Sequence, residues 1–487
     1  MSTLLKRLGK VCIYLYCMSR KPGYLLRLKR LWRKKRFDGA HTYSVVTSVY
    51  NVAPYLDCFF RSLTGQTLDF SRHIQLILVD DGSTDDSAAI IRRWQERFPD
   101  NIRYIYQENS GLGAARNSGL SLVTEPWVIF LDPDDFIACD FFSVADDFLR
   151  RQHRETPADE RIKVLACNYI FYFEQDRTFR DTHPLRHRFF PSERILDCGA
   201  PKAVQLSVNS AFLNRMMLAA SGLLFDERRW LSFEDAHLML RFLHDGQAGR
   251  LAYVGEARYF YRKRKAGTSN LDLGQRSKVS YLDLFRQSHI PLLEQRMARH
   301  GCIPEAMQWT FLYNCMVYLR LLLGPFPIKQ VLSPAEQQEF FTLLRQVFSY
   351  IDDRVILETD KGIKRFDAVM KDAVLVCFKD RPMSCCLVRI SGYNPIRRRL
   401  SLTYTAPMVS EEELAVDGSA CQPLARHCLG KELLGHPFLT ECRLDFRLPK
   451  GAKLLTLRVN GIDSVFHYRG RRYEKVFPLR ALPLFFG

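Results

Sequence analysis

Two short apolar runs in the first third of the chain each end in a group of acids, and this feature limits the fold more than any other. His73 to Val79 is followed by Asp80-Asp81-Gly82, and Trp127 to Leu131 is followed by Asp132-Pro133-Asp134-Asp135. Short, bulky and continuous apolar runs are typical of strands buried in a parallel sheet. Because the carboxyl ends of such strands border the crevice where α/β proteins bind ligands, the two acidic strand ends predict one polar site.

The segments around these runs alternate between strand and helix patterns. Tyr43 to Val49 and Ile102 to Tyr106 are two further β-rich runs. Apolar residues recur at helical spacing from Leu56 to Leu63 and from Ile90 to Phe98. Strands that alternate with helices at this spacing predict a parallel α/β sheet with right-handed crossovers.

A glycine pair after the third run leaves a second class of protein open. Gly111 and Gly113 resemble the start of a dinucleotide-binding fingerprint. Arg116 stands where that fingerprint has its third glycine, and the motif follows the third strand instead of the first, so a Rossmann oxidoreductase is disfavoured. The glycines are better explained by a close approach to a ligand, with Arg116 directed at a phosphate group.

The acids after the fourth run are candidate metal ligands. Asp132 and Asp134 lie two residues apart on a strand-end turn, so both carboxylates can reach one hard cation, and oxygen ligands suit Mg²⁺ or Mn²⁺. Such a cation would neutralise charge on a diphosphate leaving group. An ordinary turn rich in Asp and Pro is the alternative explanation.

Five motifs in this order resemble glycosyltransferase family 2, the inverting enzymes with a GT-A fold. They are Thr47-Ser48-Val49-Tyr50-Asn51, Gln66-Thr67, Val79-Asp80-Asp81-Gly82-Ser83-Thr84-Asp85, Asn109 to Gly119, and Phe130-Leu131-Asp132 with Asp134-Asp135. The resemblance implies a nucleotide-diphospho-sugar transferase domain with a Rossmann-like mixed sheet, which moves a sugar from a nucleotide donor, commonly a UDP-sugar, to an acceptor hydroxyl. Ser48 departs from the family, which usually has proline there, and little consequence is expected.

The same resemblance implies roles for individual residues. Asp81 would bind the nucleotide base with support from Asp80, and Asp132 would meet the ribose or a water bound to the metal. Asp135 is expected to cap the helix that follows the turn. Val49, Tyr50 and Asn51 would line the nucleotide pocket, and Arg116 would contact the donor. Asp134 would bind the metal ion directly. Arg262 or Arg264, in a basic loop, would screen the charge of the diphosphate.

An acidic pair further along the chain supplies the predicted catalytic residues. Glu234 and Asp235 open a helical pattern, and the family carries a Glu-Asp pair at this position. Asp235 would be the general base that removes the proton of the acceptor hydroxyl. A helix-capping acid remains the alternative.

The first forty residues account for part of the net charge of +18, because Lys and Arg there face a single acid, Asp38. With the leucines between them, these cations favour an amphipathic arm on an anionic membrane surface. A solvated basic tail and a nucleic-acid contact are alternatives, and no nucleic-acid partner is expected. Val11 to Met18 is too short to span a bilayer.

The chain of 487 residues is too long for one ordinary core, so several domains are expected. The predicted parts are a basic arm (1–40), a GT-A domain (41–270), a helical region (271–370) and a β-sandwich-like domain (371–487). Trp309 to Leu323 is unusually apolar, and a buried or membrane-facing helix is expected there. Fourteen cysteines without a C-x-x-C pair and the lack of a secretory signal favour reduced thiols. Cys385-Cys386 leaves a metal or redox site as a lesser alternative.

These observations predict a cytoplasmic inverting glycosyltransferase, peripheral on the inner face of the cytoplasmic membrane, that builds a bacterial surface polymer. Its expected substrates are a nucleotide sugar and a glycan, lipid-linked or polymeric acceptor, and a homo-oligomer is possible. A transferase of another group on the same fold, or a non-catalytic glycan-binding or scaffold protein, is the alternative. Intact Asp134 and Asp235 count against a non-catalytic protein.

Overall fold

The computed structural model describes residues 38–155, 161–190, 193–228, 233–244, 248–264, 274–325, 327–359, 366–407 and 411–482. These residues form two compact units, the first within 38–198, 205–228 and 234–264, and the second within 199–204, 233 and 274–482. The predicted amphipathic arm lies outside the described residues. The predicted domain boundaries stay a prediction.

The first unit is built on one mixed sheet with the strand order β3-β2-β1-β4-β9-β6-β10-β5, and β7 and β8 pair with β6 and β10. Strands β1 to β4 run parallel, whereas β9 is antiparallel to both of its neighbours. This mixed sheet confirms the predicted fold class. The strands are β1 (Tyr43–Val49), β2 (Ile74–Asp80), β3 (Ile102–Tyr106), β4 (Trp127–Phe130), β5 (Phe136–Ile137), β6 (Ile162–Phe173), β7 (Thr178–Arg180), β8 (Arg194–Asp197), β9 (Ala211–Asn214) and β10 (Arg250–Lys263).

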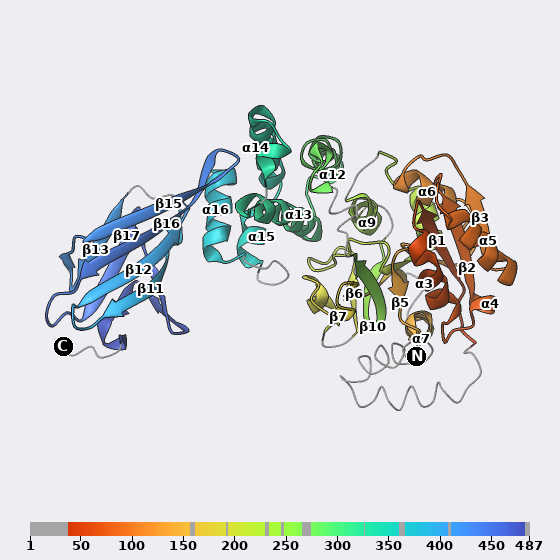
Figure 1. Ribbon diagram of the computed structural model, residues 1–487, viewed down its shortest axis with the longest axis horizontal. Coiled ribbons are helices and arrows are strands. Elements are labelled where there is room, and N and C mark those ends of the chain that lie inside the picture. The colour runs from red at the N-terminus through yellow and green to blue at the C-terminus, as the bar shows by residue number, and fades with distance from the viewer. Residues whose placement is uncertain are drawn as a thin grey trace, which may run out of the picture. The chain divides into compact units, whose positions relative to one another are not determined.

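Helices cover both faces of this sheet (Figure 1). Successive side chains of a strand point to opposite faces, so Val45 of β1 packs in the core with the apolar face of α3, and Val46 faces α6. At Gly119 of α6 a Cβ would lie 2.4 Å from Val46 Cγ1, so only glycine lets this helix pack so closely. The helices are α3 (Ala53–Thr64), α4 (Phe70–His73), α5 (Ser87–Arg97), α6 (Leu112–Leu120), α7 (Phe141–Glu155), α8 (Arg215–Ser221) and α9 (Glu234–His244).

The second unit begins with helices, as the apolar periodicity predicts. Helix α13 buries Phe311, Leu312, Cys315 and Leu319 completely, which is the buried alternative expected for this segment. Within the described ranges, each helix is too short or too polar to cross a membrane. The helices are α11 (Lys278–Tyr281), α12 (Ile290–His300), α13 (Glu305–Leu323), α14 (Pro334–Ser349), α15 (Asp353–Glu358) and α16 (Ala368–Lys379).

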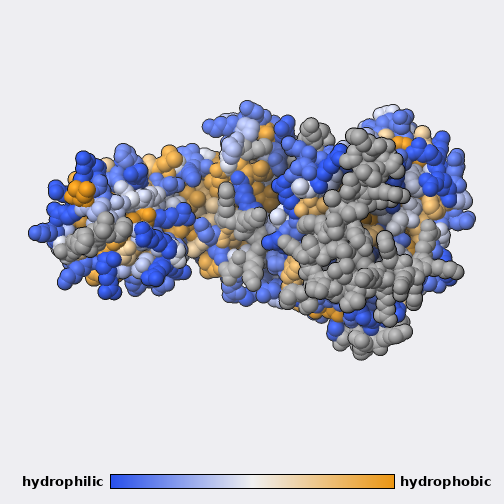
Figure 2. Space-filling view, turned by 60° about the horizontal axis from the view of Figure 1, so that its bottom comes forward, coloured by the Kyte–Doolittle hydropathy of each residue, from blue (hydrophilic) through white to orange (hydrophobic). Residues whose placement is uncertain are grey.

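The strands of the second unit form two sheets whose apolar faces share one core. One sheet has the order β15-β16-β12-β11-β19-β20, and the other has β14-β13-β17-β18 with β21 beside β17. This arrangement confirms the β-sandwich-like region, and on the face shown in Figure 2 hydrophilic residues cover much of its surface. The strands are β11 (Leu387–Asn394), β12 (Arg399–Ala406), β13 (Glu412–Val416), β14 (Ser419–Ala420), β15 (Ala425–Leu433), β16 (His436–Arg447), β17 (Leu454–Val459), β18 (Ile462–Asp463), β19 (Val465–Tyr468), β20 (Arg471–Glu474) and β21 (Val476–Pro478).

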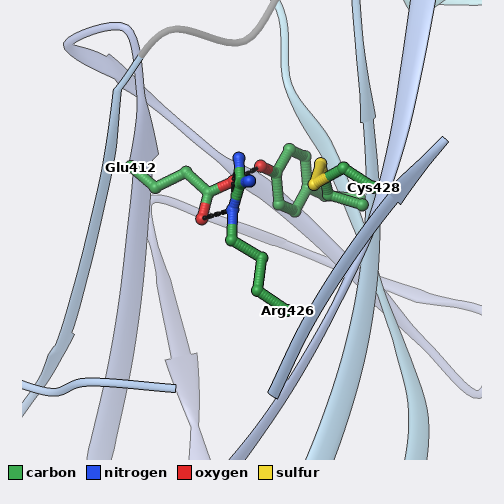
Figure 3. The surroundings of a disulfide bond; sticks show 5 residues. Glu412, Arg426 and Cys428 are labelled. Atoms are coloured by element: carbon green, nitrogen blue, oxygen red, sulfur yellow. Dashed lines mark hydrogen bonds and ion pairs between the residues drawn. A yellow bond between two sulfur atoms is a disulfide. The ribbon is translucent and has the colours of Figure 1, made fainter. Parts of the chain in front are cut away.

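The cysteines correct one expectation. Cys428 and Cys442 lie opposite each other on β15 and β16 and form a disulfide, so not every thiol is free (Figure 3). Glu412 lies beside this pair, and its carboxylate accepts hydrogen bonds from the Arg426 guanidinium and the Tyr404 hydroxyl. The antiparallel register of the consecutive strands β15 and β16 places the two cysteines opposite each other, and cysteine spacing alone does not indicate that register.

The alternative of a metal or redox site at Cys385-Cys386 finds no support in the described residues. Burial raises the pKa of the Cys386 thiol to about 12, which disfavours the reactive thiolate. Among the described side chains, the group with three possible metal ligands close together contains Glu412, Cys428 and Cys442. Neither Cys385 nor Cys386 belongs to it.

Candidate active site

The acids that end β2 organise the loops around them. The Asp80 carboxylate is fully buried and accepts hydrogen bonds from Ser83 N (2.8 Å) and the Tyr104 hydroxyl (2.9 Å). The Asp81 carboxylate accepts from Gln107 Nε2 (2.7 Å), Ser110 N (2.9 Å) and Gly111 N (2.9 Å). Asp81 therefore ties the end of β2 to the loop that opens helix α6. Its predicted contact with a nucleotide base stays a prediction.

The turn after β1 lies against the same loop. Asn51 adopts a left-handed conformation, with φ of 52°, and its Oδ1 accepts a hydrogen bond from Thr84 N at 2.8 Å. Asp81 N donates to Val49 O at 2.8 Å, and the side chain of Tyr50 is exposed. Val49, Tyr50 and Asn51 thus border the Asp80-Asp81 loop, as the predicted nucleotide pocket requires.

Two glycines, Gly111 and Gly113, allow the start of helix α6 to lie where it places Arg116 in the site. Gly111 has φ of 95°, a conformation that favours glycine, and it precedes the first residue of the helix. At Gly113 a Cβ would lie 2.2 Å from Asp226 O, so a side chain would push the helix away from this segment. Asn117 exchanges two hydrogen bonds with the backbone of Phe225, and the ring of Phe225 lies 5.2 Å from the Arg116 guanidinium carbon.

Arg116 joins three carboxylates from separate parts of the chain. Its guanidinium donates to Asp235 Oδ1 at 2.5 Å and to Asp132 Oδ1 at 3.2 Å, and it lies 3.8 Å from Glu234 Oε1. The Arg116 side chain is only 4% exposed. One buried cation therefore holds the acidic end of β4 and the first turn of α9 together.

The segment before β9 contacts the other oxygens of the same two carboxylates. Val208 N donates to Asp235 Oδ2 at 3.1 Å, and Asn209 Nδ2 donates to Asp132 Oδ2 at 2.9 Å. Each of the four oxygens thus accepts a hydrogen bond, from Arg116 on one side or from Val208 and Asn209 on the other. Both side chains are fixed in orientation, which a catalytic group requires.

Burial and like charges disturb the protonation of the acidic pair. Burial and the charge of Asp235 raise the pKa of Glu234 to about 7, and the Arg116 cation opposes this. Burial also raises the pKa of Asp235, again against the opposing effect of Arg116. A carboxylate with a raised pKa is a stronger base, and the ideal catalytic pKa lies near the working pH. The environment therefore suits proton abstraction.

Asp134 lies on the same turn as Asp132 and pairs with a different cation. Arg264 donates to Asp134 Oδ2 from Nε at 3.0 Å and from its terminal nitrogen at 2.5 Å. Burial raises the pKa of Asp134, and the charge of Asp132 adds to this effect. Arg262 Nε donates to the backbone carbonyl of Asp134 at 2.6 Å. The end of β10 thus places two arginines beside the acidic turn.

Asp135 corrects a prediction, because it does not cap the following helix. Its carboxylate is buried and accepts hydrogen bonds from the Tyr259 hydroxyl and from Arg262 N (2.7 Å). Burial raises its pKa well above the ordinary value, with a further contribution from Asp134. Asp135 instead fixes the acidic turn to β10, a partner more than a hundred residues away in sequence.

The structure brings most predicted site residues into one connected group at the carboxyl ends of β1, β2 and β4. Asn209, Val208 and Tyr259 are the contributors that sequence reasoning missed. Asn209 lies 77 residues from the Asp132 that it contacts, so no local spacing identifies the pair. The one available signal was the position of Asn209 in the segment that precedes the Glu-Asp pair in the family.

Comparison with protein families and with curated proteins gives consistent results. The family model "Glycosyl transferase family 2" matches residues 44–201. GgaA of Bacillus subtilis (strain 168), a minor teichoic acid biosynthesis protein, is 31% identical over 329 residues, which are 65% of this chain and 68% of GgaA. GgaB of the same organism, also a minor teichoic acid biosynthesis protein, is 32% identical over 330 residues, 67% of this chain, but the match spans only 34% of GgaB.

The fold is also found among solved structures. A crystal structure of an S. aureus TarS fragment in complex with UDP-GlcNAc is similar, with a TM-score of 0.52 and 18% sequence identity, over 69% of this chain and 87% of the TarS fragment. At this identity the similarity supports the fold alone. The identity and coverage of the match to GgaA, together with the family model, show that this chain belongs to glycosyltransferase family 2 and is a glycosyltransferase.

Proposed function

We propose that this glycosyltransferase moves a sugar, with inversion at the anomeric carbon, from a nucleotide-diphosphate donor to a hydroxyl of a bacterial surface polymer. The observation that carries the proposal is the convergence of Asp132, Glu234 and Asp235 on Arg116. UDP-GlcNAc in the TarS complex supports a UDP-sugar as donor. The names of GgaA and GgaB, which are minor teichoic acid biosynthesis proteins, support a polymer of the teichoic acid type as acceptor.

Asp235 acts as the general base in this proposal. An ionised carboxylate offers about four lone-pair positions, and the bonds from Arg116 and Val208 occupy one position on each oxygen. A position therefore remains for the acceptor hydroxyl. Its oxygen bonds to the anomeric carbon as the bond to the diphosphate oxygen breaks, the proton passes to Asp235, and the electron pair leaves with the nucleoside diphosphate. A single displacement of this kind inverts the anomeric centre.

Asp132 and Asp134 fit a divalent cation such as Mn²⁺ or Mg²⁺. Both offer the carboxylate oxygens that hard cations prefer, and the charge of Asp132 raises the pKa of Asp134 against the opposing effect of Arg264. When bound, the ion would neutralise charge on the leaving diphosphate. Arg262 and Arg264, which contact the acidic turn, would hold the diphosphate at the same place.

The donor class is tested with the purified full chain and a panel of nucleotide sugars: UDP-GlcNAc, UDP-GalNAc, UDP-glucose and GDP-mannose. We expect slow release of UDP from at least one UDP-sugar in the presence of Mn²⁺, with water as the acceptor, and loss of this release when EDTA removes the ion. Chromatography of the nucleotide product measures the rate. An absence of nucleotide release from every donor would contradict the proposal.

The basic N-terminal segment, residues 1–36, is proposed to hold the enzyme at the inner face of the cytoplasmic membrane. Clusters of Lys and Arg gain about 1 kcal/mol per residue near an anionic surface, and salt screens this attraction. We expect deletion of residues 1–36 to release the protein from vesicles that contain phosphatidylglycerol, in a sedimentation assay at moderate salt. Binding that persists after the deletion would exclude the segment as the anchor.

A further inference from the structure

The amide of Asn209 is held in one orientation beside the catalytic acids. Its Nδ2 donates to Asp132 Oδ2 at 2.9 Å. A flipped amide would place Oδ1 against this carboxylate oxygen, and two acceptors repel each other. The position of the amide oxygen, Oδ1, is therefore fixed too, on the side of the amide away from Asp132.

Asn209 Oδ1 is a buried acceptor without a hydrogen-bond partner among the described residues. The residue is only 5% exposed. Buried polar atoms in native proteins are nearly always paired, and an unpaired acceptor at this depth indicates a group supplied from beyond the described residues, for which a bound ligand is the candidate that we consider. Because Oδ1 accepts only, that group must be a donor.

Two neighbouring side chains repeat this pattern. Gln205 is 2% exposed and donates from Nε2 to Ser207 O at 2.7 Å, and its Oε1 is buried without a partner in the described part of the chain. Glu234 Oε2 is likewise buried and unpaired within the described ranges. The segment before β9 and the first turn of α9 thus present three buried acceptor atoms that have no partner among the described residues. Hydroxyl groups are the ligand chemistry that satisfies them.

The position of Asn209 indicates which hydroxyl it meets. In a single displacement the transferred sugar lies between the leaving diphosphate and the general base. Asn209 contacts Asp132 on the diphosphate side, and its neighbour Val208 contacts Asp235, the proposed base. We infer that Asn209 is a specificity-determining residue, whose Oδ1 accepts a hydrogen bond from a ring hydroxyl of the transferred sugar while its Nδ2 positions Asp132. This inference rests on the proposed function.

The inference is tested by comparing the wild type and Asn209 variants on a UDP-sugar and on analogues of it that each lack one hydroxyl. The probes are the UDP-sugar that the wild type turns over and its monodeoxy analogues, and the readout is kcat/KM. A site built to hydrogen-bond a substrate hydroxyl rejects the analogue that lacks it by large factors. We expect the wild type to discriminate against one analogue by about 10²-fold or more, and Asn209→Leu to reduce that ratio to below about tenfold. Ratios for the other analogues should not change.

Ser207→Ala is the matched control, because it alters the same segment without touching the amide and keeps the backbone carbonyl that Gln205 contacts, and it should keep the wild-type ratio for every analogue. Asn209→Ser provides a smaller replacement if the leucine variant does not fold. Undiminished discrimination in both Asn209 variants, or equal use of all analogues by the wild type, would overturn the inference and leave the proposed function intact. Failure of the wild type to use any nucleotide sugar would overturn both.

Discussion

Asp235→Asn lowers the rate constant for sugar transfer by about 10²–10⁴-fold, which is the usual contribution of a general base. Asparagine keeps the volume of the side chain but cannot take the acceptor proton. It also places an NH₂ group against one of the two donors, Arg116 or Val208, that the carboxylate now satisfies. The nucleotide dissociation constant should stay within a few-fold of the wild type, because the Asp81 loop is unchanged.

Glu234→Gln is the informative comparison for this result. It removes the same charge from the adjacent residue, but Glu234 lies 3.8 Å from Arg116, beyond hydrogen-bond distance. We expect a smaller loss of rate than for Asp235→Asn, measured by initial rates at saturating donor. If the order of the two losses is reversed, Glu234 is the base and Asp235 is the residue that positions it.

Asp134→Asn lowers transfer by about 10²-fold or more and weakens the response of the rate to Mn²⁺, because the stabilisation of developing charge by a bound metal is worth several kcal/mol. The substitution retains the shape of the side chain and leaves Arg264 without its carboxylate partner. Initial rates over a Mn²⁺ titration measure both effects. The exposed Asp176, whose replacement by Asn makes the same change of charge, should show the wild-type titration.

A wild-type rate and a wild-type Mn²⁺ response in Asp134→Asn would remove Asp134 from the proposed metal site. Thermal unfolding of each variant distinguishes a loss of rate caused by the missing carboxylate from one caused by misfolding. The substitution removes the repulsion between the partly exposed Asp132 and Asp134 carboxylates, which opposes the loss of the ion pair with Arg264, so Asp134→Asn is expected to fold. A loss of rate without any change in the metal response would instead indicate that Asp134 acts through Arg264.

Local patterns were enough to predict the sheet that carries the site. The apolar runs predicted at Tyr43 to Val49 and His73 to Val79 appear as the buried strands β1 and β2, because short β-branched runs are stable when buried between two layers of helices, and the run at Ile102–Tyr106 forms the edge strand β3. The acids at the ends of β2 and β4 lie on one edge because parallel strands point the same way. The spacing of the motifs was therefore sufficient to predict the fold class and the edge of the sheet at which the candidate site lies.

Contacts between distant segments could not be predicted in this way. The predicted contact of Arg116 with the donor stays a prediction, and no local pattern indicates its ion pair with Asp235, which lies 119 residues further along the chain. Asp135 was expected to cap a helix, but it accepts hydrogen bonds from β10. In both cases the local sequence limits the side chain to a small region, and a later part of the chain supplies the partner, which is helix α9 for Arg116 and strand β10 for Asp135.

The sequence by itself determined where the strands end in acids, which glycines shape the turn into α6, and which family the chain resembles, because these properties depend on burial, backbone sterics and local spacing. Only the tertiary structure decided that Arg116, Val208 and Asn209 satisfy all four oxygens of Asp132 and Asp235. It also decided that Cys428 pairs with Cys442. The physical reason is that a buried polar group takes the partner that folding brings within reach, wherever in the chain that partner lies.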